Sequence, residues 1–199
     1  LPDLEFLSLR ENGLATLPTL TSYAKLKELW LYDNQLEGVE FQKISDLIQT
    51  SQSLTELGLG KNKLHDTDLE LLAGAIKSSN TLTYLDVENE ELTERGHLAI
   101  LKCLLDMSSL EATVKSNHSL KFVDTGWDGN TGDHRATPHQ REINEVLKIN
   151  RDSGPHLSRR RIYHCIREKV VKYHLKSGYE RSEMCRVQNV DTPYTNAFA

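Results

Sequence analysis

Side chains that could activate a nucleophile or hold a metal ion gather in the last third of the chain. Five of the eight histidines lie there, at His134, His139, His156, His164 and His174. They form no H-E-x-x-H motif and no pair at positions i and i+4, and no carboxylate stands at ligand spacing from them. Cys165 follows His164, but adjacent helical residues point about 100° apart and cannot act as nucleophile and base.

We therefore expect structural or exposed histidines, no bound metal, no cofactor and no enzymatic activity. A hydrolase centred on the histidine-rich region is the alternative, which stoichiometric metal would support. Nucleotide chemistry is not indicated either, because the chain contains neither G-x-x-x-x-G-K-[ST] nor G-x-G-x-x-G. The stretch 58–61, Gly-Leu-Gly-Lys, is only superficially similar to such a loop, since Leu59 belongs to a core position of the repeat described next.

The strongest signal is a repeated pattern, L-x-x-L-x-L-x-x-N-x-L. Three copies keep every apolar position: Leu4, Leu7, Leu9, Asn12 and Leu14; Leu26, Leu29, Leu31, Asn34 and Leu36; Leu54, Leu57, Leu59, Asn62 and Leu64. A fourth copy has Leu82, Leu85, Val87 and Leu92, with Glu90 in place of the asparagine. A weaker fifth copy begins at Leu120, so successive copies start 22, 28, 28 and 38 residues apart. Such a periodicity predicts a stacked repeat architecture.

Each copy predicts one strand and one turn. Side chains alternate along a strand, so the second and third leucines face a core and the residues between them face solvent. The asparagine amide bonds backbone groups where the chain leaves the strand, and Glu90 predicts a looser turn in the fourth unit. Apolar residues at helical spacing follow, at Phe41, Ile44, Leu47 and Ile48 and again at Leu69, Leu72, Ala73 and Ile76.

The pattern resembles the leucine-rich repeats. The 28-residue units, with their helices and the phrase from Ala75 to Val87, are similar to the ribonuclease-inhibitor-like subfamily, whereas the 22-residue first unit is similar to shorter repeats of the superfamily. The resemblance covers about residues 4–128. It implies an α/β fold, a leucine-rich-repeat solenoid of four to five repeats, with a curved parallel sheet inside, helices outside and a C-terminal helical cap.

The charge distribution divides the chain into two predicted parts. Residues 1–128, the leucine-rich-repeat domain, carry 11 Lys and Arg against 21 Asp and Glu, whereas residues 129–199 carry 13 against 8. The basic part begins with a turn-rich stretch and then predicts a capping helix over about 138–150, because Thr137-Pro138 is a strong helix start. We expect a second helix over 159–176, opening with three arginines, and a loosely ordered tail over 177–199.

Residues 93–119 leave the path of the chain open. Leu110-Glu111-Ala112-Thr113-Val114 fits either an irregular strand at the expected 28-residue step or part of a long insertion. The two alternatives differ in whether the fourth and fifth copies are neighbours.

The compartment is predicted from the cysteines and the start of the chain. Cys103, Cys165 and Cys185 are odd in number and widely spaced, which favours reduced thiols and a cytoplasmic protein. No signal peptide and no membrane-spanning apolar run occur in the sequence, although its start within a repeat suggests a truncated N-terminus. The sequon at Asn117 keeps a secreted origin open.

The solvent-facing strand positions predict a binding face on the concave side. Eight of them combine rings with carboxylates and are the predicted partner-binding residues: Phe6, Glu28, Trp30, Tyr32, Glu56, Tyr84, Asp86 and Glu88. Rings within a polar field are typical of interface hot spots, and carboxylates favour a partner with a basic surface. The plainer interpretation is that these rings cover their neighbours and the acids are solvated. We expect Gly58 and Gly60 to leave a bare backbone patch between the rings.

These features predict a protein-protein interaction module rather than a nucleic-acid or membrane protein. One alternative is a regulator or inhibitor of an enzyme, in a nuclease or GTPase pathway, as the subfamily resemblance implies. Another is a silent structural segment of a longer solenoid. The oligomeric state does not follow from the sequence.

Overall fold

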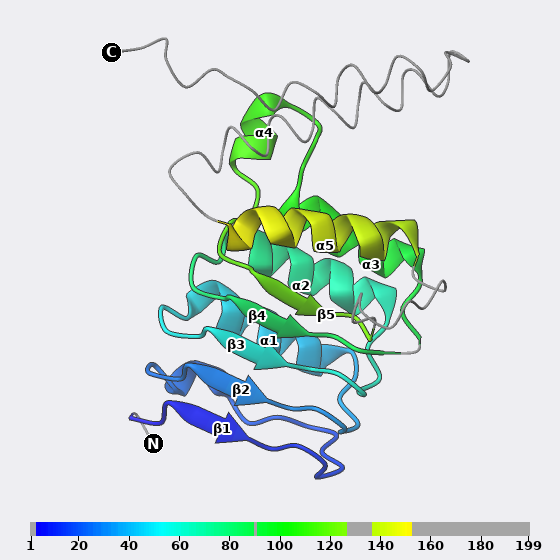
Figure 1. Cartoon of the computed structure of the whole chain (residues 1–199). Coiled ribbons are helices and arrows are strands. Elements are labelled where there is room, and N and C mark those ends of the chain that lie inside the picture. The colour runs from blue at the N-terminus through cyan, green and yellow to red at the C-terminus, as the bar shows by residue number, and fades with distance from the viewer. Residues whose placement is uncertain (1–2, 90, 127–136, 153–199) are drawn as a thin grey trace, which may run out of the picture. The chain divides into compact units, whose positions relative to one another are not determined.

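The computed structural model of the chain describes residues 3–89, 91–126 and 137–152 (Figure 1). All of them lie in one compact unit, Leu1–Arg161. The second predicted helix, over 159–176, the tail, and four of the five C-terminal histidines (His134, His156, His164 and His174) lie outside the described residues.

The centre of the unit is one parallel sheet of five short strands, ordered as in the chain. The strands are β1 (Phe6–Ser8), β2 (Glu28–Trp30), β3 (Glu56–Gly58), β4 (Tyr84–Asp86) and β5 (Phe122–Asp124). Their middle residues are paired in register as Leu7, Leu29, Leu57, Leu85 and Val123. The α/β fold with a parallel sheet is therefore confirmed, and β5 lies at the strand positions of the weaker fifth copy.

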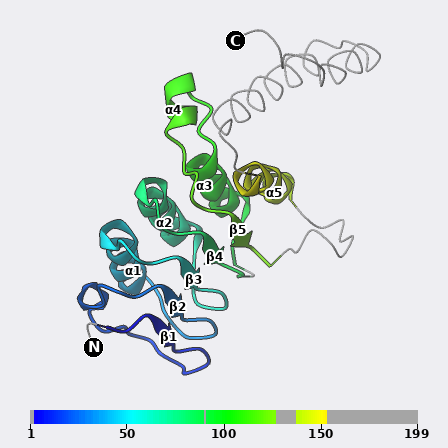
Figure 2. The same ribbon diagram turned by 60° about the vertical axis from the view of Figure 1, so that its left-hand side comes forward.

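The described residues form five α-helices between and after the strands. They are α1 (Val39–Thr50), α2 (Asp66–Ser78), α3 (Glu94–Leu104), α4 (Leu110–Val114) and α5 (Pro138–Arg151), with a 3-10 turn, η1 (Leu20–Ser22), before β2. Figure 2 shows α1, α2 and α3 side by side on one side of the strands, and each packs against the next. The two helices predicted from apolar spacing are thus confirmed as α1 and α2.

The first unit is too short for a full helix, and α1 of the second unit reaches back to hold it. Glu40 of α1 is buried, and its carboxylate accepts a hydrogen bond from the backbone N–H of Leu17 at 2.6 Å. Lys43 binds the same carboxylate at 3.0 Å and donates to the Leu17 carbonyl at 2.9 Å. The Glu40–Lys43 ion pair of α1 therefore satisfies both the N–H and the carbonyl of Leu17.

The core follows the leucine positions of the pattern. Leu29, Leu57 and Leu85 of the three central strands are fully buried. Leu7 of β1 is only half-buried, because β1 is an edge strand of the described sheet. Burial of a leucine side chain contributes about 1.5–3 kcal/mol, so the first unit gains less stability from its pattern than its neighbours do.

The segment between the fourth and fifth strands is a helical insertion. Residues 110–114 form α4, so the irregular strand is excluded and β4 pairs directly with β5. Asn117 follows, with its amide buried and donating to the carbonyls of Ile76 and Ser79 at 2.6 and 2.8 Å. Its side-chain oxygen accepts from the N–H of Leu120. A glycan on this asparagine is incompatible with the fold, so the structure does not support glycosylation at Asn117.

The asparagines of the pattern join neighbouring units. The amide of Asn34 donates to the carbonyls of Leu9 and Leu31 at 2.8 and 2.9 Å, and its oxygen accepts from the N–H of Leu14 at 2.9 Å. Leu9 and Leu14 belong to the preceding unit. One side chain thus binds two chain turns that lie side by side.

Asn62 repeats this arrangement one unit later. It donates to the carbonyls of Leu31 and Leu59, both at 2.9 Å, and accepts from the N–H of Leu36 at 3.1 Å. In the fourth unit the amide comes from Asn89, which donates to the carbonyls of Asn62 and Leu64. The looser turn expected there is therefore held by an asparagine one residue before the pattern position.

Helix α5 begins as predicted, with Thr137 and Gln140 forming a capping box around Pro138. Its apolar face is buried and packs against α3 and β5, while Asn150 donates to the carbonyl of Leu120 at 2.7 Å. The helix predicted over about 138–150 is confirmed. Its role as a cap, the number of repeats and the domain division at residue 128 stay predictions.

Replacing Asn62 with alanine should destabilise the fold by about 2–4 kcal/mol, because it leaves one buried N–H and two buried carbonyls unsatisfied. Urea unfolding of the full chain measures this. The matched control is Asn12→Ala at the same position of the first unit, where the exposed amide has a single backbone partner, Arg10. The free energy of unfolding should fall there by no more than about 0.5 kcal/mol. Equal losses at both positions would contradict the role of the asparagines in joining neighbouring units.

Candidate binding face

The side of the sheet opposite α1, α2 and α3, here called the open face, carries the predicted residues in three rows. The first row is Phe6, Glu28, Glu56, Tyr84 and Phe122, and the second is Ser8, Trp30, Gly58, Asp86 and Asp124. The third row is Arg10, Tyr32, Gly60 and Glu88. The backbone N–H groups of Glu11, Asp33 and Lys61 donate to the carbonyls of Tyr32, Gly60 and Glu88, which continues the register beyond the strands. All eight predicted residues therefore lie on one face, with adjacent strands placing them next to one another.

Trp30 is held by four neighbouring residues. Its ring lies on the backbone of Gly58, where a Cβ atom would be only 2.4 Å from Trp30 Cε3. The guanidinium carbon of Arg10 lies 4.2 Å from the ring centroid, and the Tyr84 ring lies 5.6 Å away at a tilt of 53°. The indole N–H donates to Glu28 at 3.2 Å. A ring with cationic, aromatic and hydrogen-bonding contacts is an ordered anchor.

Gly60, two residues after the end of β3, provides a second seat. A Cβ atom there would be 2.6 Å from Asp86 Oδ1 and 3.0 Å from Tyr32 Cδ2, so both side chains lie against its backbone. The expectation of a bare patch between the rings is therefore wrong, because Gly58 and Gly60 are buried under Trp30, Tyr32 and Asp86.

Asp86 is nearly buried, at 8% exposure, rather than facing solvent as predicted. Its Oδ1 accepts from the backbone N–H of Glu88 at 3.0 Å. Burial raises the pKa of Asp86. The hydrogen bond from this N–H and the charge of Arg10 lower it, the charges of Asp124 and Glu88 raise it, and the net pKa lies above the ordinary value. Burial also raises the pKa of Tyr84, and the charges of Asp86, Asp124 and Glu56 add to that rise. Tyr84 and Asp86 thus lie in a negatively charged region in the middle of the open face, which Arg10 offsets only in part.

Sequence reasoning left out four contributors to this face. Arg10 and Asp124 also occupy solvent-facing positions of the repeat, but only the structure shows that Arg10 lies over Trp30 and that Asp124 adjoins Asp86. Lys61 lies over the Tyr32 ring at 5.1 Å, and its hydrogen bond with the Tyr32 hydroxyl raises the pKa of Lys61. Arg151 comes from α5 and lies 5.1 Å from the Phe122 centroid, a contact that no local pattern signals.

The described residues offer no arrangement of histidine, cysteine, aspartate and glutamate that could hold a metal ion. His139 is paired with Glu94 across α3 and α5. The neighbouring His97 is buried, and burial lowers its pKa. No helix in the described ranges has the length and apolar character needed to cross a membrane.

Solved structures with a similar fold were found, whereas no family model and no curated protein sequence matches the chain. Leiomodin-1 Actin-Binding Site 2 superposes with a TM-score of 0.59 at 14% identity, covering 88% of this chain and 90% of that one. The tropomodulin C-terminal domain of Caenorhabditis elegans superposes with a TM-score of 0.56 at 15% identity, covering 76% and 86%. The fold is leucine-rich-repeat-like. At these identities the likeness concerns the fold alone.

The leucine-rich-repeat resemblance is therefore supported at the level of the fold. The ribonuclease-inhibitor-like subfamily is not supported by these neighbours and stays a prediction. The open face of the leucine-rich-repeat-like sheet is the candidate binding site, since it joins ordered rings with unpaired carboxylates.

Gly58→Ala should displace the Trp30 ring from the backbone of residue 58. The free energy of unfolding should fall by about 1 kcal/mol, because the contacts of the ring with Arg10 and Tyr84 are weakened. In a Trp127→Phe background, Trp30 is the single tryptophan and its emission reports the change. Gly74→Ala on α2 is the control, because a Cβ atom there meets nothing within 4 Å. An unchanged Trp30 emission spectrum in Gly58→Ala would contradict the proposed seat.

Asp86→Asn should stabilise the protein at pH 7. The pKa of Asp86 is raised above its ordinary value of 3.8, so at pH values between 3.8 and the raised pKa the folded state retains a proton that the unfolded chain has lost. Above the raised pKa the folded state holds the buried carboxylate in its charged form at a cost in stability. The wild type therefore loses stability as the pH rises from about 3.8 through the raised pKa, and the asparagine variant does not. Urea unfolding from pH 3.5 to 8 should show a gain that shrinks towards acid pH. A gain independent of pH, or a loss at pH 7, would contradict this assignment.

Proposed function

We propose that the chain is a protein-protein interaction module whose partner binds the open face. The observation that carries the proposal is the seating of Trp30, which Gly58, Arg10 and Tyr84 hold in one orientation. An anchor that is ordered before binding loses little side-chain entropy in the complex. Aromatic anchors beside arginine are the residue types that dominate interface energetics.

Actin is the first partner to test. One structural neighbour is named as an actin-binding site and its fold covers nearly the same length as this chain. At 14% identity that neighbour supplies a candidate and not an assignment. The acidic open face favours a contact region of the partner that presents lysine or arginine.

Further features belong to the same proposal. The 28-residue spacing supports the ribonuclease-inhibitor-like interpretation, with four to five repeats. The burial of Ile143, Val146 and Leu147 supports α5 as the cap of the last unit. The odd number and wide spacing of the three cysteines in the sequence support a reducing, cytoplasmic compartment. Regulation of an enzyme is the alternative in which carboxylates matter more than rings, and its binding would weaken steeply with salt.

Co-sedimentation with filamentous actin and gel filtration with monomeric actin test the proposal. Trp30→Ala and Tyr84→Ala together should weaken binding about 30-fold or more, because anchors of this type cost about 2 kcal/mol or more on truncation. Val39→Ala, an apolar truncation on the opposite side at 74% exposure, is the matched control. Absence of wild-type binding would reject actin, and undiminished binding by the double variant would reject the open face.

A further inference from the structure

Three rings of the open face are each covered by a cation of the same chain. Arg10 lies over Trp30 at 4.2 Å, Lys61 over Tyr32 at 5.1 Å and Arg151 over Phe122 at 5.1 Å. Attraction between a cation and a ring face is strongest when both are partly shielded from water. The rings of the open face therefore attract cations, and the three cations come from three different parts of the chain.

Tyr84 lies between two of these rings and is the exception. It contacts Trp30 at a centroid distance of 5.6 Å and is the register neighbour of Phe122. Within the part of the chain that the structure describes, no lysine or arginine lies over its ring. Tyr84 is half-buried, so part of its surface remains open to a ligand.

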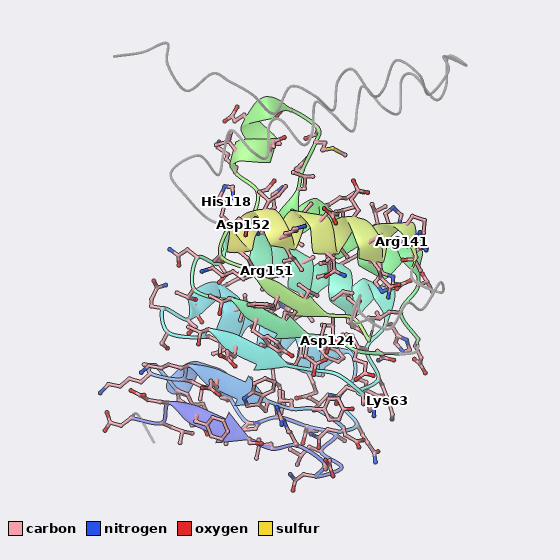
Figure 3. All side chains as sticks on the ribbon, viewed as in Figure 1. Lys63, His118, Asp124, Arg141, Arg151 and Asp152 are labelled. Carbon is pink, nitrogen blue, oxygen red and sulfur yellow. The ribbon has the colours of Figure 1, made fainter. Side chains whose placement is uncertain are left out.

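Carboxylates surround this ring. Glu56 and Asp86 lie on β3 and β4, and Asp124 lies on β5, where Figure 3 labels it near the end of the strand. Asp86 is more than nine-tenths buried, and its Oδ1 accepts from the backbone N–H of Glu88 rather than from a cation. None of the ion pairs between described residues involves Asp86, Glu56 or Asp124. Burying a carboxylate without a counter-ion is costly, and a ligand cation would offset that cost.

We propose that the guanidinium of a partner arginine binds over Tyr84, between Asp86 and Asp124. The inference rests on the proposed function, since it specifies the chemistry of the same face. A guanidinium is flat enough to stack on the ring while its edge donates to two acceptors, a combination that an ammonium group does not offer. Arg10 does not fill this place, because it is stacked on Trp30.

The site also accounts for the unfavourable position of Asp86. Gly60 leaves the space in which its carboxylate lies, and a side chain at that position would close it. The chain thus keeps a buried charge at a cost to its own stability, as binding sites often do. In the complex, the guanidinium pairs with the Asp86 carboxylate, and the removal of this unfavourable burial contributes to the affinity.

The test uses the full chain and three small probes: the Nα-acetyl methylamides of arginine, citrulline and lysine. Titration followed by NMR of the Tyr84 ring and the Asp86 amide should show saturable shifts with the arginine probe. The neutral citrulline probe, which has nearly the same shape, should bind at least about tenfold more weakly, and the lysine probe should fall between them.

Variants of the chain separate the two halves of the site. Asp86→Asn should weaken the arginine probe about tenfold while its side-chain oxygen still accepts from Glu88, which keeps the fold. Tyr84→Phe should retain binding and Tyr84→Leu should weaken it about fivefold. Glu145→Gln on α5 removes the same charge at an exposed position and should have no effect.

Equal affinity for arginine and citrulline, shifts centred on Trp30 instead of Tyr84, or an unaffected Asp86→Asn variant would each overturn the inference. None of these results bears on whether the open face captures a protein, which the Trp30 and Tyr84 double variant tests separately. Loss of protein binding in that variant, together with no arginine response at Tyr84, would leave the function standing and reject the site.

Discussion

Side-chain amides at the strand ends hold this fold together. Each strand has only three residues, so the ladder between two strands has few backbone hydrogen bonds. Asn34, Asn62 and Asn89 add bonds that cross from one unit to the next. The residues before the first two, Asp33 and Lys61, take left-handed backbone conformations with φ of 54° and 51°, which turn the chain so that the amides reach back. Strand register, and with it every row of the open face, depends on these turns.

The strand register places Gly58 and Gly60 under the side chains of neighbouring strands, and this determines the shape of the open face. Because Trp30 is level with Gly58, the indole lies on backbone and contacts Tyr84 two strands away. Gly60 does the same for Asp86, so a carboxylate is taken out of water beside other carboxylates. The absence of side chains at two positions therefore shapes both features, the ordered ring over Gly58 and the buried carboxylate over Gly60.

The repeat allowed the fold to be predicted well, because the leucine spacing determines which strand residues are buried and which strands pair. The same spacing placed all eight candidate residues on one face. It failed where side-chain direction decides the outcome: the glycine patch is covered, and Asp86 is buried. It also failed where another residue takes over a role, as Asn89 does, and where a contact such as Arg151 on Phe122 joins residues far apart in sequence.

The contacts of Trp30 also join three successive units of the array. Arg10 lies two residues after β1, Trp30 ends β2, and the glycine on which the indole lies ends β3. In an array whose units contact mainly their neighbours, one side chain that contacts both adjacent units couples their positions. A displacement of the turn after β1 or of the backbone of β3 would therefore move the anchor itself.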